Sequence, residues 1–502
     1  MNHGLIFSIT QNPFLSRSVG AHRIAHYLRE LDWDIEVVDW ANWWQLDQLK
    51  EFFRSRYSQQ TTFVGFSHLF SMWTPMMEEF CHWIKEEYPH IRTISGSAVN
   101  PMFESQQIDY YIQGFGEYAI VELLKYIQGN GKAPIFNLAA PRGKKIISAI
   151  HNYPAFPMKS LMVRYQDRDF IEPHEWLTIE TSRGCVFSCA FCNFPVLGVK
   201  EDYSRDADDF QLQLQDTHNR FGVTSYIIAD ETFNDRSDKI LKFANVVENL
   251  NFPTWFSGYI RADLLVSRKE DREHLSRMNF LGHYYGIESF NDRSARAVGK
   301  GMDSSRLQEG LVDIKTYFES TGSGRYRGSM GLIAGLPYET QESLNKTFAW
   351  LKTHWQGHSF SIHPLLIPTK NSINNDSKIS ADLQKYGYQT IDQDEIDLLY
   401  RDRSNKLVTN FSHIIEPGMR KNVTEEVIWK NEQMNWFDAQ EICIDVAKQK
   451  NLYDFKPSCH ALSYKLTESK DIASKLALDF KIFDSQFDYS LDKYVSKKLN
   501  LC

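Results

Sequence analysis

The stretch WLTIETSRGCVFSCAFC, residues 176–192, joins a short apolar run to three cysteines, Cys185, Cys189 and Cys192. Thiolates bind zinc or iron, so the first alternative is a structural zinc site. Such sites are closed by four ligands that usually arrive as two pairs, and no second pair follows here. His174 lies before the run, and the next cysteine along the chain is Cys443. Three thiolates leave one coordination position open, whereas a cluster used only for electron transfer is normally held by four thiolates.

The apolar run before the cysteines is the first of six candidate strands, with helix-like segments such as 238–250 and 342–354 between them. Alternating strands and helices predict a parallel α/β arrangement. Six such units predict a partial (β/α)6 TIM-like barrel, whose chemistry lies at the carboxyl ends of the strands. The expected strands are 176–182, 225–231, 254–260, 283–289, 325–335 and 359–367.

The first 130 residues show a second series of strands and helices. The runs GLIFSI, IEVVDW, TTFVGFSHL and RTISGS predict buried strands, and apolar residues at helical spacing lie between them. This pattern predicts an α/β, doubly wound, Rossmann-like parallel sheet. Ligands of such sheets bind in the crevice at the carboxyl ends of the strands.

These patterns divide the chain into four parts. We expect a Rossmann-like domain at 1–130 and a linker at 131–174, where periodicity is lost and Pro and Lys recur. The partial barrel follows at 175–370, and a mostly helical domain at 371–502 would cap the substrate site. A chain of 502 residues is long enough for about three domains.

Composition narrows the setting of the protein. Hydrophobic residues make up 42% and charged residues 24%, as in ordinary globular proteins. We expect a cytoplasmic protein, because the sequence has no membrane-length apolar run and its first residues do not resemble a secretory signal. A net charge of −8 without a Lys and Arg cluster disfavours general nucleic-acid binding. Seven cysteines, an odd number, argue against a disulfide framework, and we expect structural roles for Cys81, Cys443, Cys459 and Cys502.

The C-x-x-x-C-x-x-C motif after a strand, with Phe191 before its last cysteine, resembles the signature of radical SAM enzymes. The resemblance implies that Cys185, Cys189 and Cys192 hold a 4Fe-4S cluster whose fourth iron binds S-adenosylmethionine. It also implies that reductive cleavage produces a 5′-deoxyadenosyl radical, with the cofactor supplying the chemistry and the protein positioning it. A flavodoxin or ferredoxin would then supply the electron.

The resemblance extends along residues 176–370 and implies a set of contacts to S-adenosylmethionine. Asp230 and Glu231 lie where the family often has a GGE-like segment, although the paired glycines are missing here. Glu288 and Ser289 end the fourth strand, and the segment GLIAGLPYET resembles the fifth strand and its turn. The implied contacts are Phe191, Asp230, Glu231, Arg261, Glu288, Ser289, Gly335 and Pro337, and Thr340 is expected to cap the next helix.

A Rossmann-like domain before such a barrel resembles the cobalamin-binding subfamily. The loop after the first strand has no aspartate, so the D-x-H-x-x-G motif of histidine-ligated cobalt is missing, and Ser97 replaces the second member of the glycine pair. The S-x-L motif at 67–69, Gly96 and the GFGE segment at 114–117 fit the subfamily. The implied cobalamin contacts are Ser67, Leu69, Gly96, Ser97, Gly114, Gly116 and Glu117.

The leading interpretation is a cobalamin-dependent radical SAM methyltransferase acting on an unactivated carbon. The alternatives are a radical SAM isomerase, cyclase or oxidant that transfers no methyl group, and a cluster-bearing sensor. The cysteine count disfavours auxiliary clusters. Neither the substrate, which is a small molecule or a biopolymer, nor a catalytic side chain can be assigned. Tyr400, Arg401, Trp429 and Trp436 either line the substrate site or pack in the core, and packing is favoured.

Overall fold

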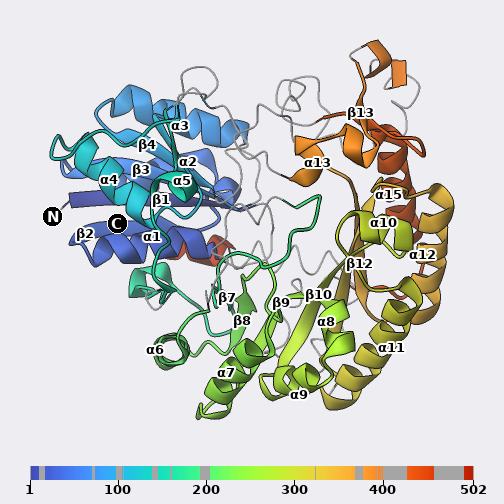
Figure 1. Cartoon of the computed structure of the whole chain (residues 1–502). Helices are drawn as coiled ribbons and strands as arrows, with labels where there is room; N and C mark the ends of the chain where they lie inside the picture. Colours follow the sequence, from blue (N-terminus) through green and yellow to red (C-terminus); the bar gives the residue numbers. More distant parts are fainter. Residues whose placement is uncertain are drawn as a thin grey trace.

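The computed structural model contains two parallel sheets of six strands each, joined by a segment that crosses between them (Figure 1). It describes residues 2–10, 17–69, 74–97, 105, 107–137, 145–158, 161–192, 204–322, 324–367, 377–392, 394–396, 398–399, 427–450, 452–456 and 491–500. Tyr400, Arg401, Cys459 and Cys502 lie outside these residues. Within them, every helix is too short or too polar to span a membrane.

The first sheet has the strand order β2-β1-β3-β4-β5-β6 and is parallel throughout. Its strands are β1 (Asn2–Thr10), β2 (Trp33–Val38), β3 (Thr61–Leu69), β4 (Arg92–Ser97), β5 (Tyr110–Gln113) and β6 (Lys145–Ser148). The helices are α1 (Val19–Arg29), η1 (Ala41–Trp43), α2 (Leu46–Arg56), α3 (Pro75–Glu87), α4 (Glu117–Ile127) and α5 (Ala149–Asn152). The α/β, doubly wound prediction is confirmed.

Two separate cores cover the two faces of this sheet. Apolar residues of α1 and α4 pack on one face, and those of α2 and α3 pack on the other. Residues 491–500, which are helical, pack in the second of these cores through Leu491, Tyr494 and Val495. The end of the chain therefore contributes to the core of the first domain.

The second sheet runs in sequence order, β7-β8-β9-β10-β11-β12, and all its neighbouring strands are parallel. The strands are β7 (Trp176–Ile179), β8 (Ser225–Ile228), β9 (Trp255–Ile260), β10 (Phe280–Glu288), β11 (Arg327–Ala334) and β12 (Ser359–Pro364). The helices are α6 (Ala207–Phe221), α7 (Ser237–Glu248), α8 (Ala262–Ser267), α9 (Glu270–Arg277), α10 (Asp292–Ala297), α11 (Ser304–Thr321) and α12 (Gln341–His354). Parallel strands in sequence order with helices between them form the open six-stranded barrel that the sequence predicts.

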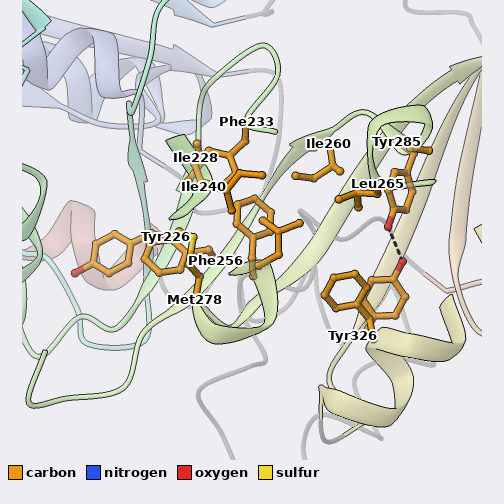
Figure 2. Close-up of a cluster of buried hydrophobic side chains, with 14 of the residues drawn as sticks. Tyr226, Ile228, Phe233, Ile240, Phe256, Ile260, Leu265, Met278, Tyr285 and Tyr326 are labelled. Carbon is orange, nitrogen blue, oxygen red and sulfur yellow. Dashed lines mark hydrogen bonds between the residues drawn. The ribbon is translucent and has the colours of Figure 1, made fainter. Parts of the chain in front are cut away.

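The barrel core lies between the strands and the helices around them (Figure 2). Tyr226, Ile228 and Phe256 point outward from β8 and β9 and meet Ile240 of α7. The hydroxyls of Tyr285 and Tyr326 lie 3.0 Å apart and hydrogen-bond inside this core. Thr340 caps α12 as expected, because its Oγ1 accepts from the Ser343 amide at 3.1 Å. The outward residues thus fill the core, and the alternate residues line the barrel interior.

The remaining elements join or cap these two units. Part of the segment expected as a linker forms β6 and α5, which belong to the first sheet. The carboxyl-terminal region packs over the ends of β11 and β12 and contains both strands and helices. The elements are η4 (Asp167–Asp169), α13 (Lys378–Ala381), η6 (Gln384–Tyr386), β13 (Gln389–Thr390), β14 (Trp429–Lys430) and α15 (Trp436–Lys450).

Candidate functional site

One cavity of about 650 Å³ lies between the carboxyl ends of the first sheet and those of the barrel strands. Its wall includes Cys185, Cys189 and Cys192, together with residues of both sheets. Such folds bind ligands at the carboxyl ends of their strands, and in both sheets these ends face the same cavity.

The loop that carries the three cysteines is anchored from several sides. The Ala190 amide donates to the Val298 carbonyl at 3.0 Å, and the Ile379 amide donates to the Ala190 carbonyl at 3.0 Å. Lys378 of α13 donates to the carbonyl and hydroxyl oxygens of Ser188 at 2.8 and 2.9 Å. These contacts connect the loop to the α10 turn and to the carboxyl-terminal region.

The donor set fits an iron–sulfur cluster better than a single metal ion. Within the described residues, no three His, Cys, Asp or Glu side chains converge on one metal position. In a 4Fe-4S cluster each cysteine binds a different iron, so the three thiols need not meet at one point. Cys81 and Cys443 are buried away from the cavity and pack as apolar side chains, as expected.

Asp230 and Glu231, which follow β8 after one residue, form different contacts with their carboxylates. Asp230 is fully buried and accepts from the amides of Thr181 and Ser182 at 2.8 and 2.9 Å. Both neighbouring hydroxyls also donate to it. Its carboxylate therefore fixes the start of the cysteine loop. Glu231 lines the same cavity, accepts from the Gly184 amide at 3.1 Å, and has its pKa raised to about 7 by burial.

Glu288 lies at the end of β10 in an unusual backbone conformation. Its φ is +66°, and the pairing of β10 with β11 shifts register between Gly286 and Glu288. A left-handed conformation costs a residue with a side chain about 1–3 kcal/mol and is concentrated at functional sites. Burial raises the pKa of Glu288, although Lys300, whose Nζ lies 3.4 Å from Oε1, opposes the shift. Both side chains line the cavity.

Arg261 approaches the cysteine loop from the end of β9. Its Nη1 lies 4.0 Å from the Cys189 sulfur, and its guanidinium stacks 3.8 Å from the centre of the Phe187 ring. Asp263 accepts from Nε and Nη2 at 3.0 and 2.6 Å. A positive charge is thus held beside the thiols, where it stabilises negative sulfur. Phe191 lines the cavity between the cysteines.

Three expected contacts lie outside the cavity wall. Ser289 is buried and donates its hydroxyl to Glu339. Gly335, with φ +92°, lies under the Trp429 ring, and its carbonyl accepts from the Tyr388 hydroxyl at 2.7 Å. Pro337 is buried in the same turn. In this structure these residues support the turn after β11 and face the carboxyl-terminal region.

The expected residues of the first domain are mostly in the cavity wall. Ser67 of β3, Gly96 of β4, and Gly114, Gly116 and Glu117 at the start of α4 line it. The side chains of Leu69 and Ser97 lie outside the described part of the chain. Deeper in the first domain the wall is apolar, with Ile6, Ile94 and Ile112 on the sheet and Ile24 and Ile120 on the helices.

Other cavity residues carry no motif and were missed by the sequence analysis. Arg23, Glu180 and Arg183 lie at the junction of the two sheets. Tyr259, Tyr284 and His363 line the barrel part of the cavity, where the Tyr284 hydroxyl lies 3.1 Å from the Ser361 hydroxyl. Trp429 and Trp436 are buried and lie outside the cavity wall, so packing, the favoured alternative, is what the structure shows. Glu180 follows β7 and Tyr259 lies near the end of β9, so position at a strand end could have indicated these two, whereas Arg23 lies within α1 and carried no such signal.

The fold and the cysteine loop define the class of protein. Residues 179–351 match the radical SAM superfamily. The chain therefore contains a radical SAM domain, and the cofactors that this family implies are a 4Fe-4S cluster and S-adenosylmethionine.

Particular relatives share the sequence or the fold. An uncharacterized methyltransferase of Pyrococcus horikoshii, PH0819, is 22% identical over 258 residues, which cover 50% of this chain and 54% of the relative. The chain thus spans about half the length of this curated relative.

Two solved structures resemble the whole chain. TsrM from Kitasatospora setae, a radical S-adenosylmethionine methyltransferase with tryptophan substrate and the SAM analog aza-SAM bound, aligns with a TM-score of 0.59 at 13% identity and covers 94% of this chain and 99% of its own. OxsB, a cobalamin-dependent S-adenosylmethionine radical enzyme with aqua-cobalamin bound, aligns with a TM-score of 0.56 at 14% identity and covers 99% of this chain and 80% of its own. At sequence identities this low, the structural similarity shows that the fold is shared.

Proposed function

We propose that this protein is a cobalamin-dependent radical SAM enzyme that methylates an unactivated carbon. One observation carries the proposal: a single cavity connects the three cysteines with the carboxyl ends of the first sheet. A cluster bound at the cysteines and a corrinoid bound on the first sheet would share this space, and so would a substrate. The methyltransferase relative and the cobalamin named for OxsB support the same function.

In this proposal, Cys185, Cys189 and Cys192 hold the cluster and leave its fourth iron for S-adenosylmethionine. A reduced cluster bound there would supply the electron that cleaves one S-adenosylmethionine to methionine and a 5′-deoxyadenosyl radical, and cobalamin would carry the methyl group of a second S-adenosylmethionine to the substrate. The reaction therefore requires an external reductant, for which we propose a flavodoxin or ferredoxin.

The charged residues around the loop would orient S-adenosylmethionine. Glu231 and Glu288 each place a half-buried carboxyl group in the cavity, where it can accept from the ammonium or ribose hydroxyls. Arg261 places a cation beside Cys189, where it favours the electron-rich cluster. Asp230 acts indirectly, because its oxygens hold the loop backbone.

The first domain fits a large ligand with an apolar part. A Cβ atom added at Gly96 would meet nothing within 4 Å, so open space extends beside the end of β4. Ile94 and Ile112 of the sheet and Ile24 of α1 continue this space between the sheet and its helices. An apolar slot that opens into the shared cavity suits the nucleotide tail of a corrinoid, and the wider part suits its ring.

The test uses full-length protein purified without oxygen. We expect about four irons per chain, loss of iron in the C185A/C189A/C192A variant, and release of 5′-deoxyadenosine with dithionite and S-adenosylmethionine. Expression in cobalamin-supplemented cells should yield bound corrinoid, and methyl-labelled S-adenosylmethionine should transfer its label to substrate.

Each failure points to a different alternative. Deoxyadenosine without bound corrinoid or label transfer would indicate an isomerase, cyclase or oxidant. A bound cluster that forms no deoxyadenosine would indicate a sensor. Tetrahedral zinc at the cysteines would contradict the whole proposal.

A further inference from the structure

Two segments of the chain flank the cysteine loop, 292–306 around α10 and 377–386 around α13. The Ala190 amide of the loop donates to the Val298 carbonyl at 3.0 Å, and the Ala190 carbonyl accepts from the Ile379 amide at 3.0 Å. Both segments therefore pack directly on the loop that carries the three cysteines.

The loop has an outer side, which faces away from the cavity and reaches the surface. Gly299 is exposed, and a Cβ atom added to it would lie only 3.7 Å from the Cys189 Cα. Val186 is 47% exposed and lies outside the cavity wall, although Cys185 and Phe187 on either side of it line that wall. A molecule that docks on this outer side thus comes close to the cysteines without entering the cavity.

This outer side is basic, although the chain as a whole carries a net charge of −8. The two flanking segments contain six Lys and Arg residues and three Asp residues. Arg293 and Arg296 are exposed and lie three residues apart on α10, and Lys378 of α13 is exposed where it donates to Ser188. Asp303 lies near Arg296 and offsets part of this charge. The remaining excess of positive charge attracts a negatively charged partner.

The proposed reaction requires a partner of this kind. Reductive cleavage of S-adenosylmethionine consumes one electron, which has to reach the cluster from outside the protein. Electron transfer slows steeply with distance, so a protein donor has to dock where the cluster ligands lie near the surface. Flavodoxins and ferredoxins are acidic proteins, and electron carriers form small, weak complexes that charge attraction helps to orient.

We propose that α10, the turn at 298–301 and α13 form the docking surface for a small, acidic electron-transfer protein. This inference rests on the proposed function, since it assumes a 4Fe-4S cluster on the three cysteines. The reduced partner gives one electron to the cluster and is itself oxidised by one electron, and no atom is transferred. The donor therefore binds the outer side of the loop, while S-adenosylmethionine and the substrate occupy the cavity side.

Charge reversal on α10 tests this surface. Arg293→Glu and Arg296→Glu are combined in one variant, and Arg296→Glu is also made alone, because the Arg293 guanidinium stacks 3.9 Å from the centre of the Tyr338 ring. The matched control is R54E/K125E, which reverses two exposed cations on α2 and α4 of the first domain. The control changes the net charge of the protein by the same amount as R293E/R296E.

The first readout is deoxyadenosine formation by full-length protein purified without oxygen. An acidic flavodoxin with its reductase and NADPH, an acidic ferredoxin reduced in the same way, and excess dithionite are the three electron sources. With either protein donor below saturation, we expect R293E/R296E to form deoxyadenosine about tenfold more slowly than the unmutated protein. With dithionite the two rates should be equal, because a small reductant needs no docking surface.

The second readout is binding, measured by titration calorimetry with the oxidised flavodoxin. We expect the Kd to rise about tenfold in R293E/R296E and less in R296E, and added salt should narrow both differences. R54E/K125E should match the unmutated protein in Kd and in both rates. Iron content should be the same in all variants.

Several results would overturn the proposal. Equal flavodoxin-dependent rates and Kd values in R293E/R296E and the unmutated protein would place docking elsewhere. Equal slowing with dithionite would show damage to the cysteine loop, and equal slowing in R54E/K125E would show a response to net charge alone. If the unmutated protein accepts electrons from dithionite but from neither protein donor, this surface does not bind an acidic carrier. If it forms no deoxyadenosine even with dithionite, the proposed function itself fails.

Discussion

At the scale of single residues, Gly335 shows how one backbone position can determine the packing of a whole region. Its φ of +92° belongs to the left-handed region that residues with side chains rarely adopt. The Trp429 ring occupies the position that a Cβ would take, and Tyr388 donates to the Gly335 carbonyl at 2.7 Å. The packing of the carboxyl-terminal region against the end of β11 therefore depends on this glycine.

We predict that Gly335→Ala destabilises the protein by about 2–5 kcal/mol, combining the backbone strain with the displacement of Trp429. Chemical denaturation monitored by tryptophan fluorescence would measure the change.

Gly357→Ala supplies the control for this prediction. Gly357 has a φ of +83° with nothing within 4 Å of an added Cβ, so only the backbone cost of about 1–2 kcal/mol should remain. Equal losses in the two variants would show that contact with Trp429 contributes nothing.

Glu288 carries the second prediction at this scale. We expect Glu288→Gln to raise the KM for S-adenosylmethionine about tenfold, because a charged acceptor in a buried site is lost, while iron content stays unchanged. Deoxyadenosine formation at varied S-adenosylmethionine concentration measures it.

Glu342→Gln on the exposed surface of α12 is the control and should leave the KM unchanged. Loss of iron in E288Q would instead assign Glu288 to the cysteine loop.

Local sequence identified some site residues and could not identify others. The cysteines, Glu231 and Glu288 follow strand ends at fixed spacing, so their motifs place them near one another. Arg183 follows β7 of the barrel and Glu117 begins α4 of the first domain, 66 residues earlier, so their contact depends on how the two domains meet. The positive φ of Gly335 favours glycine, but its contact with the Trp429 ring depends on how the carboxyl-terminal region packs.

At the scale of elements, most strands of the two sheets were predictable, including the four-residue β7 and β8, and β6 was not. Buried strands of the two sheets form nearly continuous apolar runs, and β3 and β4 begin and end at the expected residues. β6 has only four residues and follows a Pro- and Lys-rich stretch, so its place in the first sheet depends on pairing with β5. Hydrophobic pattern identifies an element when its own length buries enough surface.

The helix α15 provides a prediction about pH. Lys450, at its end, donates to the Phe360 carbonyl of β12 at 2.6 Å, and burial lowers its pKa to about 8 from an ordinary value of 10.5. Below pH 8 both folded and unfolded chains hold the proton, so the burial cost is fully present. Between pH 8 and 10.5 the unfolded chain binds more protons, and stability rises with pH.

We therefore expect the stability of the unmutated protein, relative to Lys450→Met, to increase by about 1–3 kcal/mol between pH 7 and pH 10. Urea denaturation at a series of pH values measures the difference.

Lys448→Met, on the exposed side of the same helix, should show no such rise. A pH-independent difference between the unmutated protein and K450M would contradict the lowered pKa.

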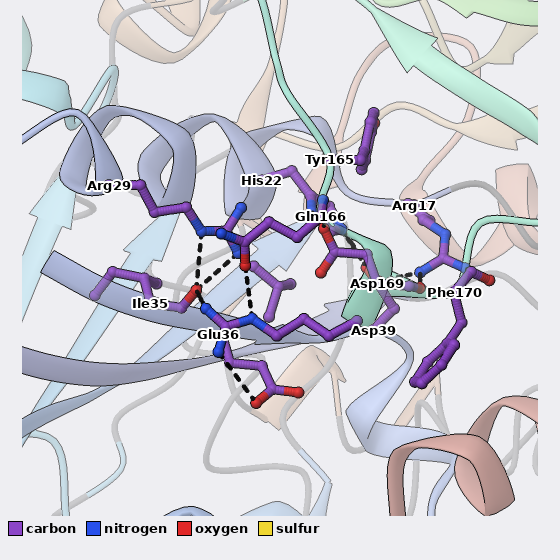
Figure 3. Close-up of polar contacts among 12 residues, drawn as sticks. Arg17, His22, Arg29, Ile35, Glu36, Asp39, Tyr165, Gln166, Asp169 and Phe170 are labelled. Atoms are coloured by element: carbon purple, nitrogen blue, oxygen red, sulfur yellow. Dashed lines mark hydrogen bonds and ion pairs between the residues drawn. The ribbon is translucent and has the colours of Figure 1, made fainter. Parts of the chain in front are cut away.

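At the scale of the whole molecule, Arg17 joins three parts of the chain. Figure 3 shows it beside Asp169 and Phe170, whose carbonyls accept from Nη1 and Nη2 at 2.8 and 3.2 Å. Its guanidinium donates to Asp39 at 2.6 Å in the first domain and to both oxygens of Glu175, at 2.7 and 2.8 Å, directly before the barrel. It also packs against the Trp40 and Tyr494 rings, 4.7 and 5.1 Å from their centres, and Tyr494 belongs to the final helical segment. This contact therefore ties the first domain and the final helical segment to the start of the barrel.

We predict that Arg17→Met destabilises the protein by about 3–5 kcal/mol, because two buried carboxylates lose their counter-charge. Calorimetry should show a lower unfolding temperature and separation of the first domain from the barrel. His22 lies 3.0 Å from Asp39 and remains its partner in this variant, so Asp39 should lose less stabilisation than Glu175.

The same variant should become more sensitive to acid. Burial alone would raise the pKa of Asp39, but His22 and Arg17 outweigh it and hold that pKa well below its ordinary value. This stabilisation is present above the unfolded pKa of 3.8 and is lost as the pH falls through the folded pKa. Without Arg17 the folded pKa rises, so acid unfolding should begin at a higher pH.

Arg17→Lys provides the control that separates charge from geometry. Lysine keeps the positive charge but cannot bond two carboxylates as a fork, so it should recover acid resistance more than thermal stability. If R17K and R17M unfold at the same pH, charge at this position does not hold the domains together. If R17M unfolds in one transition at the temperature of the unmutated protein, the first domain and the barrel are joined by their other contacts.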